Sequence, residues 1–186
     1  MGALNPALDL LDGEKILWTG APAAGVRLQA RDAFLIPFSL LWCGFAIFWE
    51  YSVTAHRRVP VFFILWGIPF VLVGLFMVFG RFFVDAWLRG RTRYALTNQR
   101  ILIHRAAPLA RFTALSLRQL PDMSLTEHAQ GRGTIRFGEQ AGSFSQRNGI
   151  AGWIPALDPT AHFIAVDNAA TLFRQIQQAQ REAQTG

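Results

Sequence analysis

Histidine, serine and cysteine are the residue types in this sequence that could act as nucleophiles, bases or metal ligands. Glu127-His128 does not form the His-Glu-x-x-His pattern of a zinc-binding helix. Ser143 and Ser145 lie in a glycine-rich stretch, but without the Gly-x-Ser-x-Gly turn that activates a serine. Cys43 lies inside an apolar run, where a thiol acts as a small packing residue.

We therefore predict a protein that is not an enzyme, with no catalytic residue, no metal site and no cofactor. An enzyme would need polar side chains that folding brings together from distant parts of the chain. The histidines are expected to be solvated or hydrogen-bonded residues of strands and loops: His56, His104, His128 and His162.

Arginine is the other chemically distinctive residue type, and it is concentrated in one segment. The chain carries 18 Lys+Arg and 12 Asp+Glu, a net charge of +6. Eight arginines and one acidic residue, Asp85, lie from Arg81 to Arg118, so this segment has a charge of +7 and the rest of the chain −1. Such clusters attract anionic lipid, nucleic acid or acidic proteins. The candidate contacts for an anionic lipid or a protein partner are Arg89, Arg91, Arg93, Arg100 and Arg105.

Two uncharged apolar runs precede most of this basic segment, at residues 33–49 and 59–80. A helix needs about 20 apolar residues to cross a bilayer. The chain is also 52% hydrophobic and only 16% charged, against about 25% charged in soluble domains. We predict membrane-spanning helices at about 33–53 and 60–88, which form a transmembrane hairpin over 32–89. The alternative is that the two runs form buried core helices of a soluble protein. This alternative is disfavoured, because too little of the chain is left to cover two such helices.

The distribution of arginines predicts the orientation of this hairpin. Basic residues flank both of its outer ends, although the tip also contains Arg57 and Arg58. By the positive-inside rule, both termini are expected in the cytoplasm. Nucleic acid is not an expected partner, because no reader motif is present and the arginines are held at the bilayer.

Residues 90–180 have the pattern of a small β domain followed by a helix. Alternating residues predict strands at 91–96, 100–104, 111–118, 123–128, 134–137 and 161–166. Residues 138–153 are rich in Gly, Ser and Gln and are predicted to form a loop. Apolar residues at Ala169, Leu172, Phe173 and Ile176 predict an amphipathic helix over about 168–180, with a fraying tail at 181–186.

Several short motifs, in this order, resemble those of the bacterial pleckstrin-homology-like (PH-like) membrane protein family. Residues 14–22, EKILWTGAP, are similar to the family's E-x-I-L-W-x-G-x-P segment, which precedes a pair of membrane helices. Residues 94–100, YALTNQR, resemble its Y-x-L-T-x-x-R hairpin, and residues 131–137, GRGTIRF, resemble its G-x-G-T-I-x-F turn and strand. Residues 115–123 and 163–176 are similar to a further strand and to the closing strand and helix.

The resemblance implies an α+β membrane protein: a two-helix transmembrane hairpin plus a small PH-like antiparallel β-barrel capped by a C-terminal helix. Its parts would be an N-terminal cytoplasmic segment at 1–31, the hairpin at 32–89, the PH-like domain at 90–180 and the tail at 181–186. The implied location is the bacterial inner membrane. The implied function is non-enzymatic, as a scaffold or assembly factor that binds a membrane protein complex of unknown identity.

Two alternative functions follow from the charged residues. Arginines just cytoplasmic of a membrane helix attract anionic headgroups, by about 1 kcal/mol each, so the cluster would bind or sense anionic lipid, or simply set the topology. Glu50 and Asp85, near the ends of the apolar runs, raise the idea of a channel or transporter subunit. A channel requires a homo-oligomer, because two helices do not enclose a pore.

Overall fold

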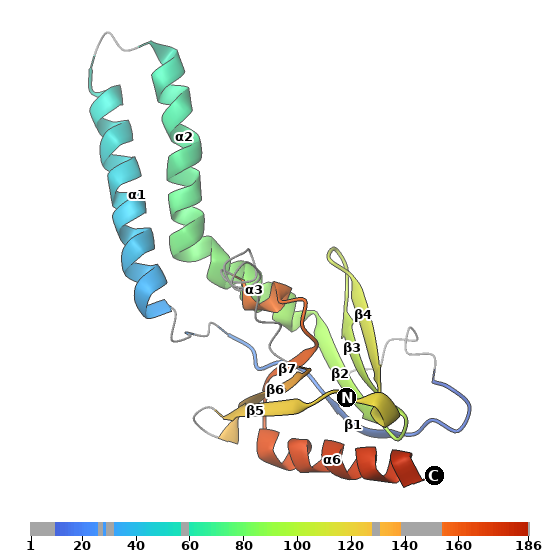
Figure 1. The fold of residues 1–186 in the computed structure, drawn as a ribbon. Coiled ribbons are helices and arrows are strands. Elements are labelled where there is room, and N and C mark those ends of the chain that lie inside the picture. The colour runs from blue at the N-terminus through green and yellow to red at the C-terminus, as the bar shows by residue number, and fades with distance from the viewer. Residues whose placement is uncertain are drawn as a thin grey trace. The chain divides into compact units, whose positions relative to one another are not determined.

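The computed structural model describes residues 10–25, 28, 32–56, 60–127, 131–138 and 154–185. Its strands are β1 (Ile16–Gly20), β2 (Thr92–Thr97), β3 (Arg100–Arg105), β4 (Arg111–Ser116), β5 (Met123–Glu127), β6 (Gly133–Phe137) and β7 (His162–Val166) (Figure 1). Its α-helices are α1 (Asp32–Thr54), α2 (Val61–Leu75), α3 (Arg81–Gly90) and α6 (Ala169–Thr185). Single turns are η1 (Phe76–Gly80), η2 (Leu117–Gln119) and η4 (Pro155–Leu157).

The chain divides into two compact units. The helical unit consists of Gly25–Trp87 together with Ile154–Leu157. The sheet unit consists of the described residues up to Ala24, from Leu88 to Gly138 and from Asp158 to Thr185. The sheet unit is thus assembled from pieces of chain on both sides of the hairpin.

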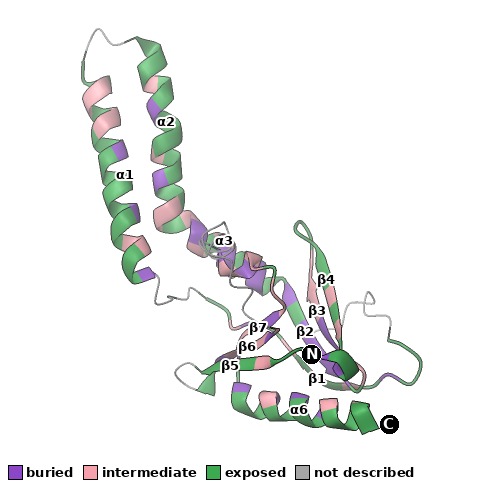
Figure 2. Cartoon of the chain, viewed as in Figure 1, coloured by how far each residue is buried: buried purple, intermediate pink, exposed green. Residues whose placement is uncertain are grey.

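The helical unit contains two helices that are long and apolar enough to cross a membrane, as the sequence predicts. They are α1, with 23 residues, and the continuous helix Val61–Gly90, with 30 residues. Only 22% and 11% of their most apolar windows are buried, whereas the core helix of a soluble protein is mostly buried. Figure 2 accordingly shows exposed residues over most of α1 and α2.

Small residues line the contact between α1 and α2. Cys43 and Ala46 of α1 are buried, as are Gly67 and Gly74 of α2. A Cβ atom at Gly74 would lie 2.9 Å from the Cα of Cys43. Helices in lipid associate through such close packing, so Gly74 sets the distance between the two helices.

The basic end of the hairpin is held by buried charged residues. Arg81 Nη1 lies 2.9 Å from Asp32 Oδ1, which joins the start of α1 to the start of α3. Asp85 Oδ1 accepts a hydrogen bond from the backbone N–H of Ala156 at 2.9 Å. Spacing along the helix predicts that Arg81, Asp85 and Arg89 pair with one another, and the structure gives each of them a partner outside the helix.

The sheet unit contains two antiparallel sheets, in the order β1-β2-β3-β4 and β5-β6-β7. Both sheets and α6 contribute to one core. Phe163 of β7 is fully buried at its centre, with its ring centroid 4.5 Å from that of Tyr94, 5.2 Å from Phe137 and 5.6 Å from Trp18. Leu172, Ile176 and Ala179 form the buried face of α6 against this core. The predicted α+β class, the β2–β3 hairpin and the C-terminal amphipathic helix are confirmed.

Three structural findings bear on the expectations. The described strands form two sheets, so the β-barrel stays a prediction. The boundary predicted at residue 31 cuts β1 away from β2, its partner in the sheet. Helix α6 continues to Thr185, five residues beyond the predicted end at 180. Predictions for Arg57, Arg58, His128, Ser143, Ser145 and most of the 138–153 loop lie outside the described residues.

The close approach at Gly74 generates a prediction with a matched control. Gly74→Ala should destabilise the hairpin by about 1–3 kcal/mol, because the added methyl group overpacks the contact with Cys43. Gly44→Ala should not destabilise it, because a Cβ at Gly44 meets nothing within 4 Å. Reversible unfolding in mixed detergent micelles measures both variants. Equal stabilities would show that the helices do not pack through Gly74.

Candidate functional site

Arg89, the first of the predicted contact residues, is buried. Only 2% of its surface is exposed, and its Nη1 donates a hydrogen bond of 2.7 Å to the carbonyl oxygen of Ala23. Ala23 in turn donates its backbone N–H to the carbonyl oxygen of Ala165 at 3.1 Å. Arg89 therefore connects the end of α3 to the segment that follows β1, and it does not present its charge on the described surface.

Arg91, Arg93 and Arg105 lie together at one end of the first sheet. Thr92 pairs with Arg105 in the β2–β3 ladder, and Arg105 pairs with Arg111 in the β3–β4 ladder. Arg111 is thus a fourth basic residue at this end, outside the predicted set. Its Nη2 donates to the carbonyl oxygen of Pro159 at 2.8 Å.

The loop between β3 and β4 is fastened to the residue that follows the long helix. Arg91 Nη1 donates to the carbonyl oxygen of Ala107 at 2.6 Å, and Ala106 donates its N–H to the carbonyl oxygen of Arg91 at 3.0 Å. Within the loop, Arg105 Nε donates to the carbonyl oxygen of Leu109 at 2.8 Å. These bonds hold the loop beside the C-terminal end of α3.

Two large apolar side chains are exposed among these arginines. Leu109 is 48% exposed and Phe112 is 50% exposed, and the Phe112 ring lies beside His104 at a centroid distance of 6.5 Å. We refer to the whole group as the β3–β4 tip, which consists of Arg91, Arg93, Arg105, Leu109, Arg111 and Phe112.

Positive charge at the β3–β4 tip is not compensated by acidic residues of the neighbouring sequence. None occurs between Asp85 and Asp122. Burial, together with the nearby charge of Arg111, lowers the pKa of the Arg105 guanidinium. Arginine nevertheless stays protonated, so an anion placed between these side chains would relieve their repulsion.

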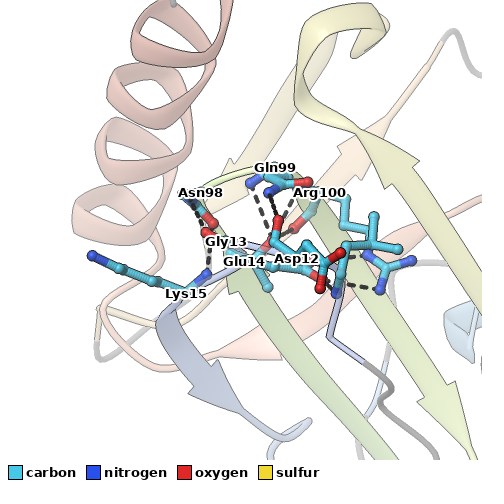
Figure 3. A network of polar contacts seen from close by, with 9 residues as sticks. Asp12, Gly13, Glu14, Lys15, Asn98, Gln99 and Arg100 are labelled. Carbon is cyan, nitrogen blue, oxygen red and sulfur yellow. Dashed lines mark hydrogen bonds and ion pairs between the residues drawn. The ribbon is translucent and has the colours of Figure 1, made fainter.

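Arg100 lies at the opposite end of β3, in a different environment. Its Nε and Nη2 donate to Glu14 Oε1 and Oε2 at 2.9 and 3.0 Å (Figure 3). Thr97 Oγ1 also donates to Glu14 Oε1 at 2.7 Å, and the N–H of Leu11 donates to Oε2 at 2.7 Å. The Glu14 side chain has no exposed surface, so its carboxylate is satisfied entirely by this cluster, which we call the Glu14 clasp (Leu11, Glu14, Thr97 and Arg100).

The turn between β2 and β3 extends the Glu14 clasp. Asn98 Oδ1 accepts the N–H of Lys15 at 2.7 Å, and Asn98 returns its own N–H to the carbonyl oxygen of Lys15 at 3.0 Å (Figure 3). Gln99 Nε2 donates to the carbonyl oxygen of Asp12 at 3.2 Å. The clasp joins residues 11–15 to residues 97–100, which are far apart in the sequence. It therefore fixes the N-terminal segment on the turn between β2 and β3.

Three histidines lie among the described residues. His56 follows α1 and contacts the carbonyl oxygen of Ser52 through Nδ1. His104 and His162 lie in β3 and β7, and His162 Nδ1 contacts the carbonyl oxygen of Thr160. Burial lowers the pKa of His162. Among the described residues, no three His, Cys, Asp or Glu side chains lie close enough to hold a metal ion.

Comparison with protein-family models, with curated proteins and with solved structures finds no match to this chain. The structure brings Arg91, Arg93 and Arg105 together, and it separates Arg89 and Arg100 from them. The sequence prediction missed Leu109, Arg111 and Phe112, although large apolar residues beside an arginine, in a segment without acidic residues, are visible in the sequence.

The Glu14 clasp predicts a specific dependence of stability on pH. Burial of the Glu14 carboxyl opposes ionisation, but hydrogen bonds from Arg100, Leu11 and Thr97 outweigh it, so the pKa of Glu14 lies below its ordinary value of 4.5. The stabilisation is complete above pH 4.5 and is lost as the pH falls through the lowered pKa. Glu14→Gln should therefore cost about 2 kcal/mol at neutral pH, and this difference should shrink in acid.

Urea unfolding followed by near-ultraviolet circular dichroism, which reports the aromatic core around Phe163, measures this difference. Glu182→Gln on α6 removes an exposed carboxylate and is the matched control. A cost of Glu14→Gln that stays constant between neutral and acidic pH would contradict the role given to the ionised carboxylate.

Proposed function

We propose that this chain is a non-enzymatic, two-span protein of the bacterial inner membrane whose sheet unit, a PH-like module, binds anionic lipid headgroups through the β3–β4 tip. The observation that carries the proposal is the exposed pair Leu109 and Phe112 set among four arginines. Apolar side chains of this kind partition into the interfacial region, while arginines bind phosphate through two donors at once.

The length of the second helix supports this location for the β3–β4 tip. A helix of 30 residues is about 45 Å long, so it can cross the hydrocarbon core of about 30 Å and continue through the headgroup layer. Gly90 would then end at the headgroup layer, and the β3–β4 loop is hydrogen-bonded to Arg91, the next residue. By the positive-inside rule this is the cytoplasmic surface, where anionic lipid attracts each arginine by about 1 kcal/mol.

A second function, as a scaffold for a membrane protein partner, is favoured by a different part of the sheet unit. The resemblance of the motif order to the PH-like family supports it, and among the described residues no strand pairs with the outer side of β4. Lipid binding would then position the module, and the open edge would receive the partner.

The proposal predicts that Leu109 contacts lipid only when anionic lipid is present. An environment-sensitive fluorophore attached to Leu109→Cys, in a Cys43→Ala background, should shift to the blue in nanodiscs that contain phosphatidylglycerol. Lipid-borne nitroxide should quench it there. In phosphatidylcholine alone both effects should be weaker, because the electrostatic attraction of the arginines is missing.

Matched variants distinguish binding by the β3–β4 tip from a general electrostatic attraction between the chain and the membrane. Arg111→Gln should weaken the binding of the tip to anionic lipid by about 1 kcal/mol. Arg174→Gln on α6 removes the same charge elsewhere and should not weaken it. A fluorophore at Gln177→Cys reports the exposed face of α6 and should stay in water. An equal signal in both lipids, or at both labelled positions, would refute lipid binding by the tip.

A further inference from the structure

Strand β4 forms an edge of the first sheet. It pairs with β3 along its whole length, from Arg105↔Arg111 to Arg100↔Ser116, and it is the last strand in the order β1-β2-β3-β4 (Figure 1). Among the described residues no strand pairs with its other side. An edge strand of this kind presents a row of backbone donors and acceptors that can accept another strand.

A groove lies at the end of this strand that is distant from the β3–β4 tip. Its volume is about 600 Å³, and its lining residues are Leu11, Asn98, Gln99, Arg100, Ala114, Ser116, Arg118 and Ala183. Ala114 and Ser116 are exposed and small, so they leave room for a backbone to approach. Ser116 supplies a hydroxyl group for a hydrogen bond in the groove, whereas the side chains of Asn98 and Gln99 line it while bonded to Lys15 and Asp12.

The charge of the groove specifies its occupant. Arg118 is exposed at the groove, and Arg100 lies behind it with its guanidinium directed to Glu14. None of the described residues that line the groove is acidic. A segment that pairs with β4 and carries carboxylates would therefore match the groove in both hydrogen bonding and charge.

We propose that the β4 edge and its groove bind an extended, acidic segment of a partner protein, which adds to the sheet as a fifth strand. Backbone pairing with β4 provides the affinity. An ion pair between a carboxylate of the partner segment and the guanidinium of Arg118 provides the selectivity for acidic segments. The groove is separate from the β3–β4 tip, because Arg100↔Ser116 and Arg105↔Arg111 lie at opposite ends of the same ladder, whereas the edge of β4 runs from the groove to Arg111 and Phe112 of the tip.

The test uses the full chain in phosphatidylcholine nanodiscs and a fluorescent octapeptide that alternates glutamate and valine. The peptide should bind saturably, and its lysine–valine counterpart should not. Arg118→Glu should weaken binding at least about tenfold, because it places like charges opposite one another. Arg174→Glu makes the same change on the exposed face of α6 and should leave binding unchanged.

Two further peptides test the strand pairing itself. One carries N-methyl groups on every glutamate amide and the other on every valine amide, so each blocks one edge of the added strand. Strand addition predicts that one of them loses binding and the other keeps it. Absent binding of the parent peptide, full binding by both methylated peptides, or equal effects of Arg118→Glu and Arg174→Glu would overturn the proposal. The Leu109→Cys signal is measured independently, so failure here is distinct from failure of lipid binding.

Discussion

The pairing of β1 with β2 is the constraint on which the sheet unit depends. These strands are neighbours in the sheet, yet residues 21–91, which include the whole hairpin, separate them in the chain. The entropy of closing so long a loop must be recovered by local contacts. The Glu14 clasp, the backbone exchange between Lys15 and Asn98, and the burial of Trp18 beside Phe163 supply those contacts.

Arginine has two opposite roles in this structure, although the sequence places its arginines in one cluster. Arg81 and Arg89 are each 2% exposed and make bonds that fasten chain segments together. Arg91 and Arg93 are exposed at the surface. Burial of a charged group is costly unless it is paired, so the bonds of Arg81 and Arg89 act in folding. The exposed Arg91 combines both roles, because it fastens the β3–β4 loop through Ala107 and still lies at the surface.

The sequence alone predicts those elements whose pattern is local. The two apolar helices, the β2–β3 hairpin and the stripe of Leu172 and Ile176 on α6 all follow from residue periodicity or length. The membership of β1 in the sheet does not, because strand pairing across an insertion leaves no local signal. For the same reason the burial of Arg89, which depends on the distant Ala23, was not predictable. Of the β3–β4 tip, the charge count singles out Arg91, Arg93 and Arg105, and it leaves out Leu109, Arg111 and Phe112.

The interruption of the sheet by the hairpin has a consequence for biosynthesis. A ribosome makes β1 first, then the two apolar helices, and only afterwards β2, so β1 has no neighbour until both helices have left the ribosome. The sheet unit therefore cannot assemble on a chain whose hairpin is incomplete. A folded sheet unit would therefore indicate that the hairpin is complete. In a truncated chain β1 would stay unpaired, and Trp18 would be accessible to quality-control proteases.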